Sequence, residues 1–187
     1  MTTVALATLL QVKRTLRITN TDDDGLLTDI LTGCSGVIGN YLNRNLWAQD
    51  YVAEKYNGVG SVTLMVRNWP INSITSLVID GITIPPSGDG VNQSGYYFDN
   101  NQISLIGYTF TRGNMNVRLS YNAGYTVIPD DVVKGCIDMV IYNYRWLGRV
   151  GEKSKALPQG GSVTFEVALM PDQVKANLSN YRRMYPV

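Results

Sequence analysis

Apolar residues recur at helical spacing near the start of the chain, and this pattern predicts two helices. The first covers residues 8–18, with Thr8 as the expected N-cap. The second covers residues 22–43, where apolar pairs follow one another at close to the helical period of about 3.6 residues. These pairs are Leu26/Leu27, Ile30/Leu31, Val37/Ile38 and Tyr41/Leu42. Three aspartates, residues 22–24, stand where a helix N-terminus favours negative charge.

The pattern changes to one of β-strands between Tyr51 and Tyr125, a stretch rich in Val, Ile, Thr, Tyr, Gly and Asn. Short strands are expected at residues 61–67, 74–79, 96–98, 102–106 and 116–121. Asp80-Gly81, between Ile79 and Ile82, is a strong hairpin signal. Asn100-Asn101 and Gly113-Asn114 are the other predicted turns. About five or six short strands fit an antiparallel sheet or a small barrel.

Helical spacing returns after Pro129, in the segment PDDVVKGCIDMVIYNYRW, and again after Pro171. Between these two predicted helices, residues 148–162 are rich in Gly, Lys and Ser and are expected to form a mobile loop, followed by a short strand at 163–167. The predicted fold class is α+β: a bundle of about four helices with an antiparallel sheet or small barrel inserted between the second and third. We expect one domain, 1–187, with a helical body (1–47 and 126–187) and a β-rich insert (48–125).

Composition adds few constraints. The formal net charge is +1, so no strong overall field attracts the protein to nucleic acid or to an anionic membrane. We expect Cys34 and Cys136 to be small buried hydrophobic residues rather than a disulfide framework. No signal peptide is recognised, and no apolar run approaches the roughly 20 residues that span a bilayer, so a soluble protein is expected.

The chain contains no histidine, which removes the commonest general base and excludes Ser-His-Asp and Cys-His sites. No P-loop is present. The runs Asp22–Asp24 and Asp130–Asp131 are more typical of acidic residues at helix N-termini than of metal ligands. We therefore expect no cofactor, no metal site and no enzyme activity.

Two clusters of aromatic residues and arginines are candidate interaction sites, because this composition is typical of binding hot spots. The first cluster, at the end of the third long helix, is Tyr142, Arg145, Trp146 and Arg149. The second, near the end of the chain, is Tyr181, Arg182, Arg183 and Tyr185. Two structural explanations stand beside this one: the edge of a half-buried helix for the first cluster and a fraying terminus for the second.

The order of several motifs resembles the phage head–tail connector family typified by the adaptor of phage HK97, a head completion protein. They are LLQVKRTLRI at residues 9–18, YLNR at 41–44, WPINSI and VIDG at 69–74 and 78–81, GYTVIPDD at 124–131, and MPDQVKANLSNYR at 170–182. The resemblance covers nearly the whole chain.

The resemblance implies a structural virion protein at the head–tail interface, made in the bacterial host cytoplasm. Such adaptors assemble side by side beneath the portal protein in a ring of about twelve subunits. The ring prolongs the DNA channel without sequence-specific DNA binding and offers a surface to a downstream stopper or tail protein. By position, residues 170–187 would be the docking helix and tail, with Tyr181, Arg182, Arg183 and Tyr185 as portal-docking residues. The free protein would be a monomer or a weak oligomer.

Three alternatives remain open. A stopper or tail-completion protein would also have a β-rich part, although the long flanking helices favour an adaptor. A small ligand-binding module could line a groove with Tyr and Trp. An enzyme that uses carboxylates alone is disfavoured, because the acids cluster at helix starts and no pair stands out.

Overall fold

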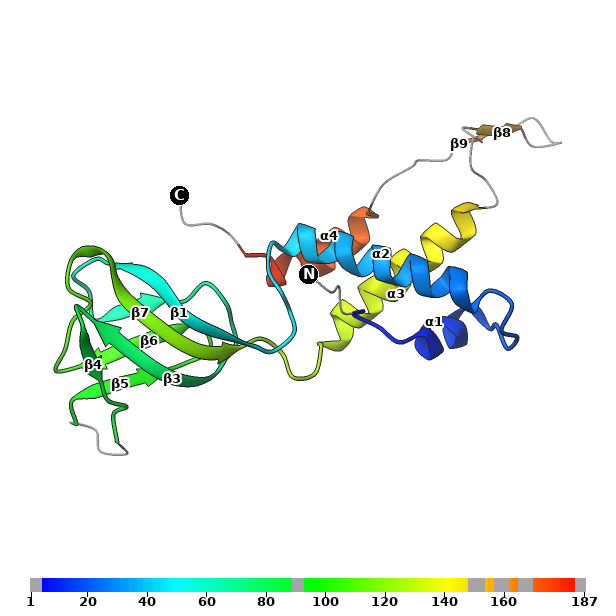
Figure 1. Ribbon diagram of the computed structural model, residues 1–187. Helices are drawn as coiled ribbons and strands as arrows, with labels where there is room; N and C mark the ends of the chain where they lie inside the picture. Colours follow the sequence, from blue (N-terminus) through cyan, green and yellow to red (C-terminus); the bar gives the residue numbers. More distant parts are fainter. Residues whose placement is uncertain (1–4, 89–92, 148–153, 157–161, 165–169, 184–187) are drawn as a thin grey trace. The chain divides into compact units, whose positions relative to one another are not determined.

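The computed structural model describes residues 5–88, 93–147, 154–156, 162–164 and 170–183. The chain divides into two compact units: a helical unit, Met1–Arg44 with Ile128–Val187, and a β unit, Asn45–Val127 (Figure 1). The β unit lies between the second and third helices in the sequence, and its strands pair antiparallel. The predicted α+β fold is therefore confirmed.

All four predicted α-helices are present in the helical unit. They are α1 (Leu9–Leu16), α2 (Asp24–Leu42), α3 (Asp130–Leu147) and α4 (Asp172–Leu178), and a 3-10 turn, η1 (Ser179–Tyr181), follows α4. Thr8 caps α1 as expected, since its hydroxyl accepts the Gln11 N–H at 3.2 Å. The Gln11 side chain in turn accepts the Thr8 N–H at 2.8 Å, which completes a capping box.

Helix α3 is the centre of the helical unit, because α1, α2 and α4 all pack against it (Figure 1). Helix α4 lies directly over Gly135, where an added Cβ would stand 3.6 Å from Val174 and 3.8 Å from Leu178. Met170 is 4% exposed, Val174 3% and Leu178 0%. The segment that begins at Met170 is therefore part of the hydrophobic core.

Two antiparallel sheets make up the β unit. Their strands are β1 (Gln49–Gly58), β2 (Thr63–Met65), β3 (Ile71–Ile79), β4 (Ile82–Ile84), β5 (Gly95–Phe98), β6 (Gln102–Ile106) and β7 (Gly113–Ala123). The first sheet has the order β1-β7-β3-β4 and the second the order β2-β6-β5. Their inner faces share one core, in which Leu77, Ile103, Phe110 and Val117 are fully buried.

The turns of the β unit were predicted with mixed success. The Asp80-Gly81 hairpin is confirmed: Ile79 pairs with Ile82, and φ is +50° at Asp80 and +83° at Gly81. The turn predicted at Gly113-Asn114 is wrong, because these residues begin β7. The side chains of Asn57 and Asn116 explain the difference. They accept the Met115 and Gly58 N–H groups at 2.8 and 2.9 Å and so extend the β1–β7 pairing.

Two short strands, β8 (Ser154–Ala156) and β9 (Ser162–Thr164), pair antiparallel between α3 and α4 in the sequence. Strand β9 overlaps the strand predicted at 163–167. The rest of the predicted mobile loop, 148–153 and 157–161, lies outside the described residues.

Candidate interaction sites

The last turns of α3 carry the first predicted cluster. The rings of Tyr142 and Trp146 stack with centroids 6.3 Å apart and an interplanar angle of 11°. Both side chains are half-buried, and Arg145 is exposed three residues from Tyr142, on a neighbouring part of the helix surface. The structure thus brings three of the four predicted residues together, and Arg149 lies outside the described residues.

Tyr144 has a different role from its aromatic neighbours. Its hydroxyl donates a hydrogen bond to Asp23 Oδ2 at 2.7 Å, which joins the end of α3 to the start of α2. This hydrogen bond raises the pKa of Tyr144, because the carboxylate favours the protonated phenol. Tyr144 therefore helps to fix the helix that presents the Tyr142–Trp146 pair.

The second predicted cluster follows α4 and is held to the helical unit by three different contacts. The Tyr181 hydroxyl lies 2.9 and 2.7 Å from the two carboxylate oxygens of Asp131. The Arg182 guanidinium lies 5.2 Å from the centroid of the Tyr41 ring. The Arg183 N–H donates to the Leu42 carbonyl at 2.9 Å, at the end of α2. Tyr185 lies outside the described residues.

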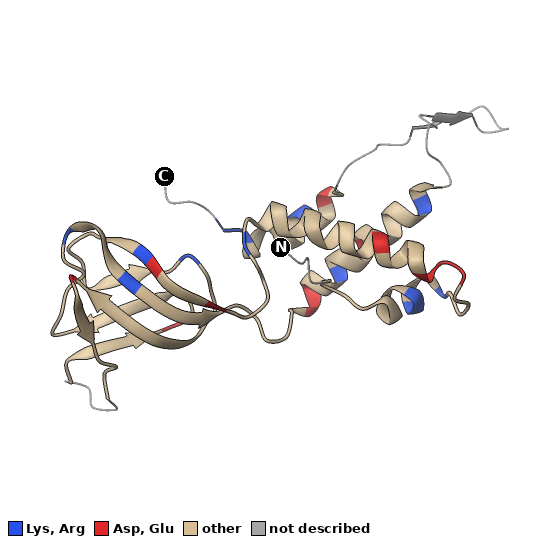
Figure 2. Cartoon of the chain, viewed as in Figure 1, with Lys and Arg blue, Asp and Glu red and all other residues tan. Residues whose placement is uncertain are grey.

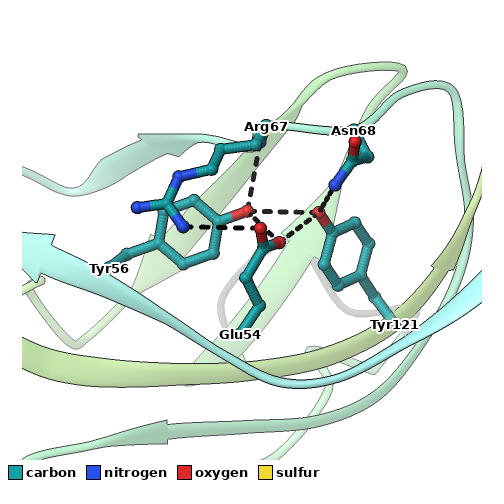
Figure 3. A network of polar contacts seen from close by, with 5 residues as sticks. All are labelled: Glu54, Tyr56, Arg67, Asn68 and Tyr121. Carbon is teal, nitrogen blue, oxygen red and sulfur yellow. Dashed lines mark hydrogen bonds and ion pairs between the residues drawn. The ribbon is translucent and has the colours of Figure 1, made fainter. Parts of the chain in front are cut away.

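A polar cluster inside the β unit was not predicted from the sequence. Figure 3 shows this Glu54 cluster: Tyr56, Tyr121 and Arg67 contact the Glu54 carboxylate, and Asn68 contacts the Tyr121 oxygen. Both phenol oxygens lie 2.7 Å from Glu54 Oε2. The Arg67 N–H donates to the Tyr56 oxygen at 3.1 Å, and the Asn68 amide donates to the Tyr121 oxygen at 3.2 Å.

The donors and acceptors of this cluster balance. Each phenol donates its one proton to Glu54 and accepts one N–H, so neither needs the 3.1 Å contact between the two phenol oxygens as a hydrogen bond. Burial raises the pKa of both Tyr56 and Tyr121. The phenols stay protonated at neutral pH, and the cluster joins β1 and β7 to the Arg67-Asn68 segment as a structural element.

The described residues contain little that suits catalysis. Burial raises the pKa of Cys34 to about 12 and that of Cys136 to about 11, so both remain unreactive thiols at neutral pH. No group of three metal-ligating side chains occurs in the part of the chain that the structure describes. Among these same residues, no helix is long and apolar enough to cross a bilayer.

A family model described as head completion protein matches residues 5–184, and so spans both units. The chain belongs to the head completion protein family. This confirms the resemblance found in the sequence, and with it the predicted function of a structural virion protein at the head–tail connection.

Two solved structures share the fold of this head completion protein. One is the neck of an empty GTA particle computed with C6 symmetry (14% identity, TM-score 0.50), which covers 97% of this chain and 92% of that chain. The other is the neck of a native GTA particle computed with C12 symmetry (13% identity, TM-score 0.51), with coverage of 96% and 90%. No curated protein sequence is significantly similar to this chain.

Proposed function

We propose that this head completion protein is an adaptor that forms a ring beneath the portal and links it to the tail. The family match over residues 5–184 carries the proposal, because it includes the helical unit and the β unit together. The ring prolongs the DNA channel and presents a surface to a downstream stopper or tail protein. DNA passes through this channel without being read in sequence, in keeping with a net charge of +1.

The proposed ring has about twelve subunits. Support comes from the neck structures that share the fold, one of which was computed with C12 symmetry and the other with C6 symmetry. Side-by-side assembly in a ring requires two different complementary surfaces on each subunit. The Tyr142–Trp146 pair with Arg145, and Arg149 beyond it, is proposed as one contact surface toward a neighbouring copy or another neck protein.

Portal docking is proposed for the end of the chain, with Tyr181, Arg182, Arg183 and Tyr185 as the docking residues. Helix α4 supports this role, because its buried face anchors the segment that precedes them. The contact of Arg182 with the Tyr41 ring is of a type worth only about 0.5–1 kcal/mol at an exposed site. Arg182 can therefore leave the Tyr41 ring for a portal surface at small cost.

An adaptor of this kind needs no catalytic activity, and we propose that this protein has none. The absence of histidine and the raised pKa values of Cys34 and Cys136 support this view. A structural role in the neck accounts for the family membership without any reaction.

Co-sedimentation with the portal ring of the same phage tests the adaptor role. The full chain should sediment with the portal at about one copy per portal subunit. A chain that ends at Arg183 tests docking, since it lacks Tyr185 and retains Met170, Val174 and Leu178 in the core. A full chain with both Arg182→Ala and Arg183→Ala tests the two arginines while Tyr185 is retained.

Three outcomes distinguish the possibilities. Loss of portal binding in the docking variants, with the helical content unchanged, supports the docking residues. Portal binding by all variants leaves the adaptor role in place and moves docking to another surface. If the full chain binds the portal only after another neck protein is added, a stopper or tail-completion role replaces the adaptor role.

A further inference from the structure

Helix α1 borders a shallow groove of about 600 Å³ that no contact described so far occupies. Leu9, Leu10 and Ile18 supply its apolar surface, and Lys13, Arg14 and Arg17 supply its charge. Leu10 is 58% exposed, on the side of α1 away from the buried Val12, so its side chain is accessible to a partner. The groove thus combines exposed apolar surface with three cations.

The charges of this groove are only partly neutralised within the chain. Lys13 Nζ pairs with Asp24 Oδ1 at 2.6 Å. Arg14 and Arg17 are exposed and form no ion pair within the part of the chain that the structure describes. No acidic residue lies between Leu9 and Ile18. A partner for the groove should therefore present an apolar side chain flanked by carboxylate.

The first turns of α2 carry such a surface. Leu26 is 43% exposed, and Asp29 is exposed three residues later, so the two are neighbours on the helix surface. Asp29 stands two residues, or about 200° of helix rotation, from both Leu27 and Leu31, which are buried. It therefore faces away from the core, and it has no ion pair among the described residues.

The groove and the Leu26–Asp29 surface of one copy face different directions. Asp24 lines the groove, and Leu26 lies two residues, or about 200° of rotation, further along the same helix. Figure 2 shows the contrast in charge between these neighbouring segments: cations on α1 and a run of aspartates before α2. Two complementary surfaces that do not face each other are what a head-to-tail ring contact requires.

We infer that the groove beside α1 receives the Leu26–Asp29 surface of a second copy of this chain. Leu26 enters the apolar part beside Leu10, and the Asp29 carboxylate lies between the Arg14 and Arg17 guanidinium groups. The inference rests on the proposed ring and specifies one of its subunit contacts. The contact repeats around the ring, because each copy offers both surfaces.

Charge reversal and its rescue test the electrostatic part. Arg14→Glu with Arg17→Glu should reduce the number of copies bound per portal about tenfold, because three carboxylates would then meet at the contact. Adding Asp29→Arg should restore most of the binding. Arg112→Glu, at an exposed cation of the β unit, is the matched control and should leave binding unchanged. Failure of Asp29→Arg to rescue would overturn the proposed pairing.

Cross-linking of the portal-bound protein tests the geometry. The native Cys34 and Cys136 are buried, so a short bis-maleimide should react with introduced cysteines alone. A chain with Arg14→Cys and Asp29→Cys should give a ladder of dimers, trimers and larger species. Chains with only one of the two substitutions should give none, as should Lys134→Cys with Asp29→Cys.

Each alternative outcome points to a different error. Dimers from a single-cysteine chain would indicate a two-fold contact and overturn the inference. Portal-bound copies in full number without any ladder would overturn it and leave the proposed ring in place. Failure of the unmodified chain to bind the portal would overturn the proposed function, and the inference with it.

Discussion

The helical unit and the β unit build their cores from the chain in different ways. The helical core joins segments from both ends of the sequence, and it includes the fully buried side chains of Val12, Leu27, Cys136 and Leu178. The β unit is one continuous segment, Asn45–Val127. The core of the helical unit therefore needs residues from both ends of the chain, whereas the core of the β unit is built from one continuous segment.

The two units also differ in how they satisfy buried polar groups. In the helical unit most backbone groups bond within the helices, and the buried hydroxyl of Ser35 donates back to Leu31 O at 2.8 Å. In the β unit the Glu54 cluster bonds side chains of β1 and β7 to the Arg67-Asn68 segment. The comparison teaches that apolar cores stabilise both units, and that the β unit in addition joins its strands through a buried charged hydrogen-bond cluster.

The largest expected effect comes from removing the end of the chain. Truncation after Leu169 deletes Met170, Val174 and Leu178 from the helical core. Loss of one large buried side chain costs about 2–5 kcal/mol, and a whole domain retains only about 5–15 kcal/mol. The helical unit should unfold while the β unit persists, which hydrogen exchange followed by mass spectrometry can resolve for each unit.

Truncation after Arg183 is the control, because it leaves all of α4 in place. Its exchange pattern should match that of the full chain in both units. Equal protection of α2 and α3 in the chain that ends at Leu169 would show that the helical core does not need α4.

A smaller effect is expected from the Glu54 cluster. Glu54→Leu leaves the buried phenols of Tyr56 and Tyr121 without an acceptor and should cost about 2–3 kcal/mol. Glu54→Gln keeps one oxygen that can accept both protons and should cost about 1 kcal/mol or less. Urea unfolding of the full chain measures both values. A similar cost for the two substitutions would indicate that charge, rather than hydrogen bonding, stabilises the cluster.

The helices could be predicted because their signals are local. Apolar spacing and capping residues such as Thr8 identify each helix without knowledge of its partners. Strand β1 was missed for the opposite reason. Its sequence, QDYVAEKYNG, does not alternate cleanly between apolar and polar residues. In the structure a bulge at Val52 and Ala53 shifts the register of β1 against β7 between Tyr51 and Glu54. Ala53 has a φ of +50°, which no propensity of alanine suggests.

The interaction sites show the same division. Tyr142, Arg145 and Trp146 lie within one helix, so their spacing alone predicts that they lie together. The contact of Tyr181 with Asp131 joins residues 50 positions apart, and that of Tyr121 with Glu54 joins residues 67 apart. Twelve tyrosines indicate half-buried positions, but only the fold determines which carboxylate each one meets.

Alkaline pH acts on both units: on the phenols of the Glu54 cluster, and on the buried thiols of Cys34 and Cys136, whose pKa values burial also raises. Burial raises the pKa of Tyr56 and Tyr121 above the usual value of 10.0, so the folded state holds these protons more tightly than the unfolded state. Their contribution to stability is complete below pH 10 and declines as the pH rises beyond it. Each phenol should cost up to about 1.4 kcal/mol per pH unit in this range.

Hydrogen exchange is too fast to follow at such pH, so the measurement is urea unfolding between pH 9 and pH 12, with tyrosinate absorbance as a second signal. Tyr121→Phe should make the decline shallower, since it removes one of the two phenols. An unchanged slope in this variant would mean that other groups cause the alkaline loss of stability.

The smallest effect on stability is expected at Arg182. Its contact with the Tyr41 ring is exposed, so Arg182→Ala should lower the free energy of unfolding by at most about 0.5–1 kcal/mol. Portal binding should fall much further, because an arginine that acts as a binding hot spot contributes about 2 kcal/mol or more. Arg182→Lys keeps the charge but loses the planar guanidinium and should restore binding only in part. Urea unfolding and co-sedimentation on the same three chains separate the two effects. Parallel losses of stability and binding would place Arg182 in the helical unit's own structure, and an effect on binding alone would assign it to the portal contact.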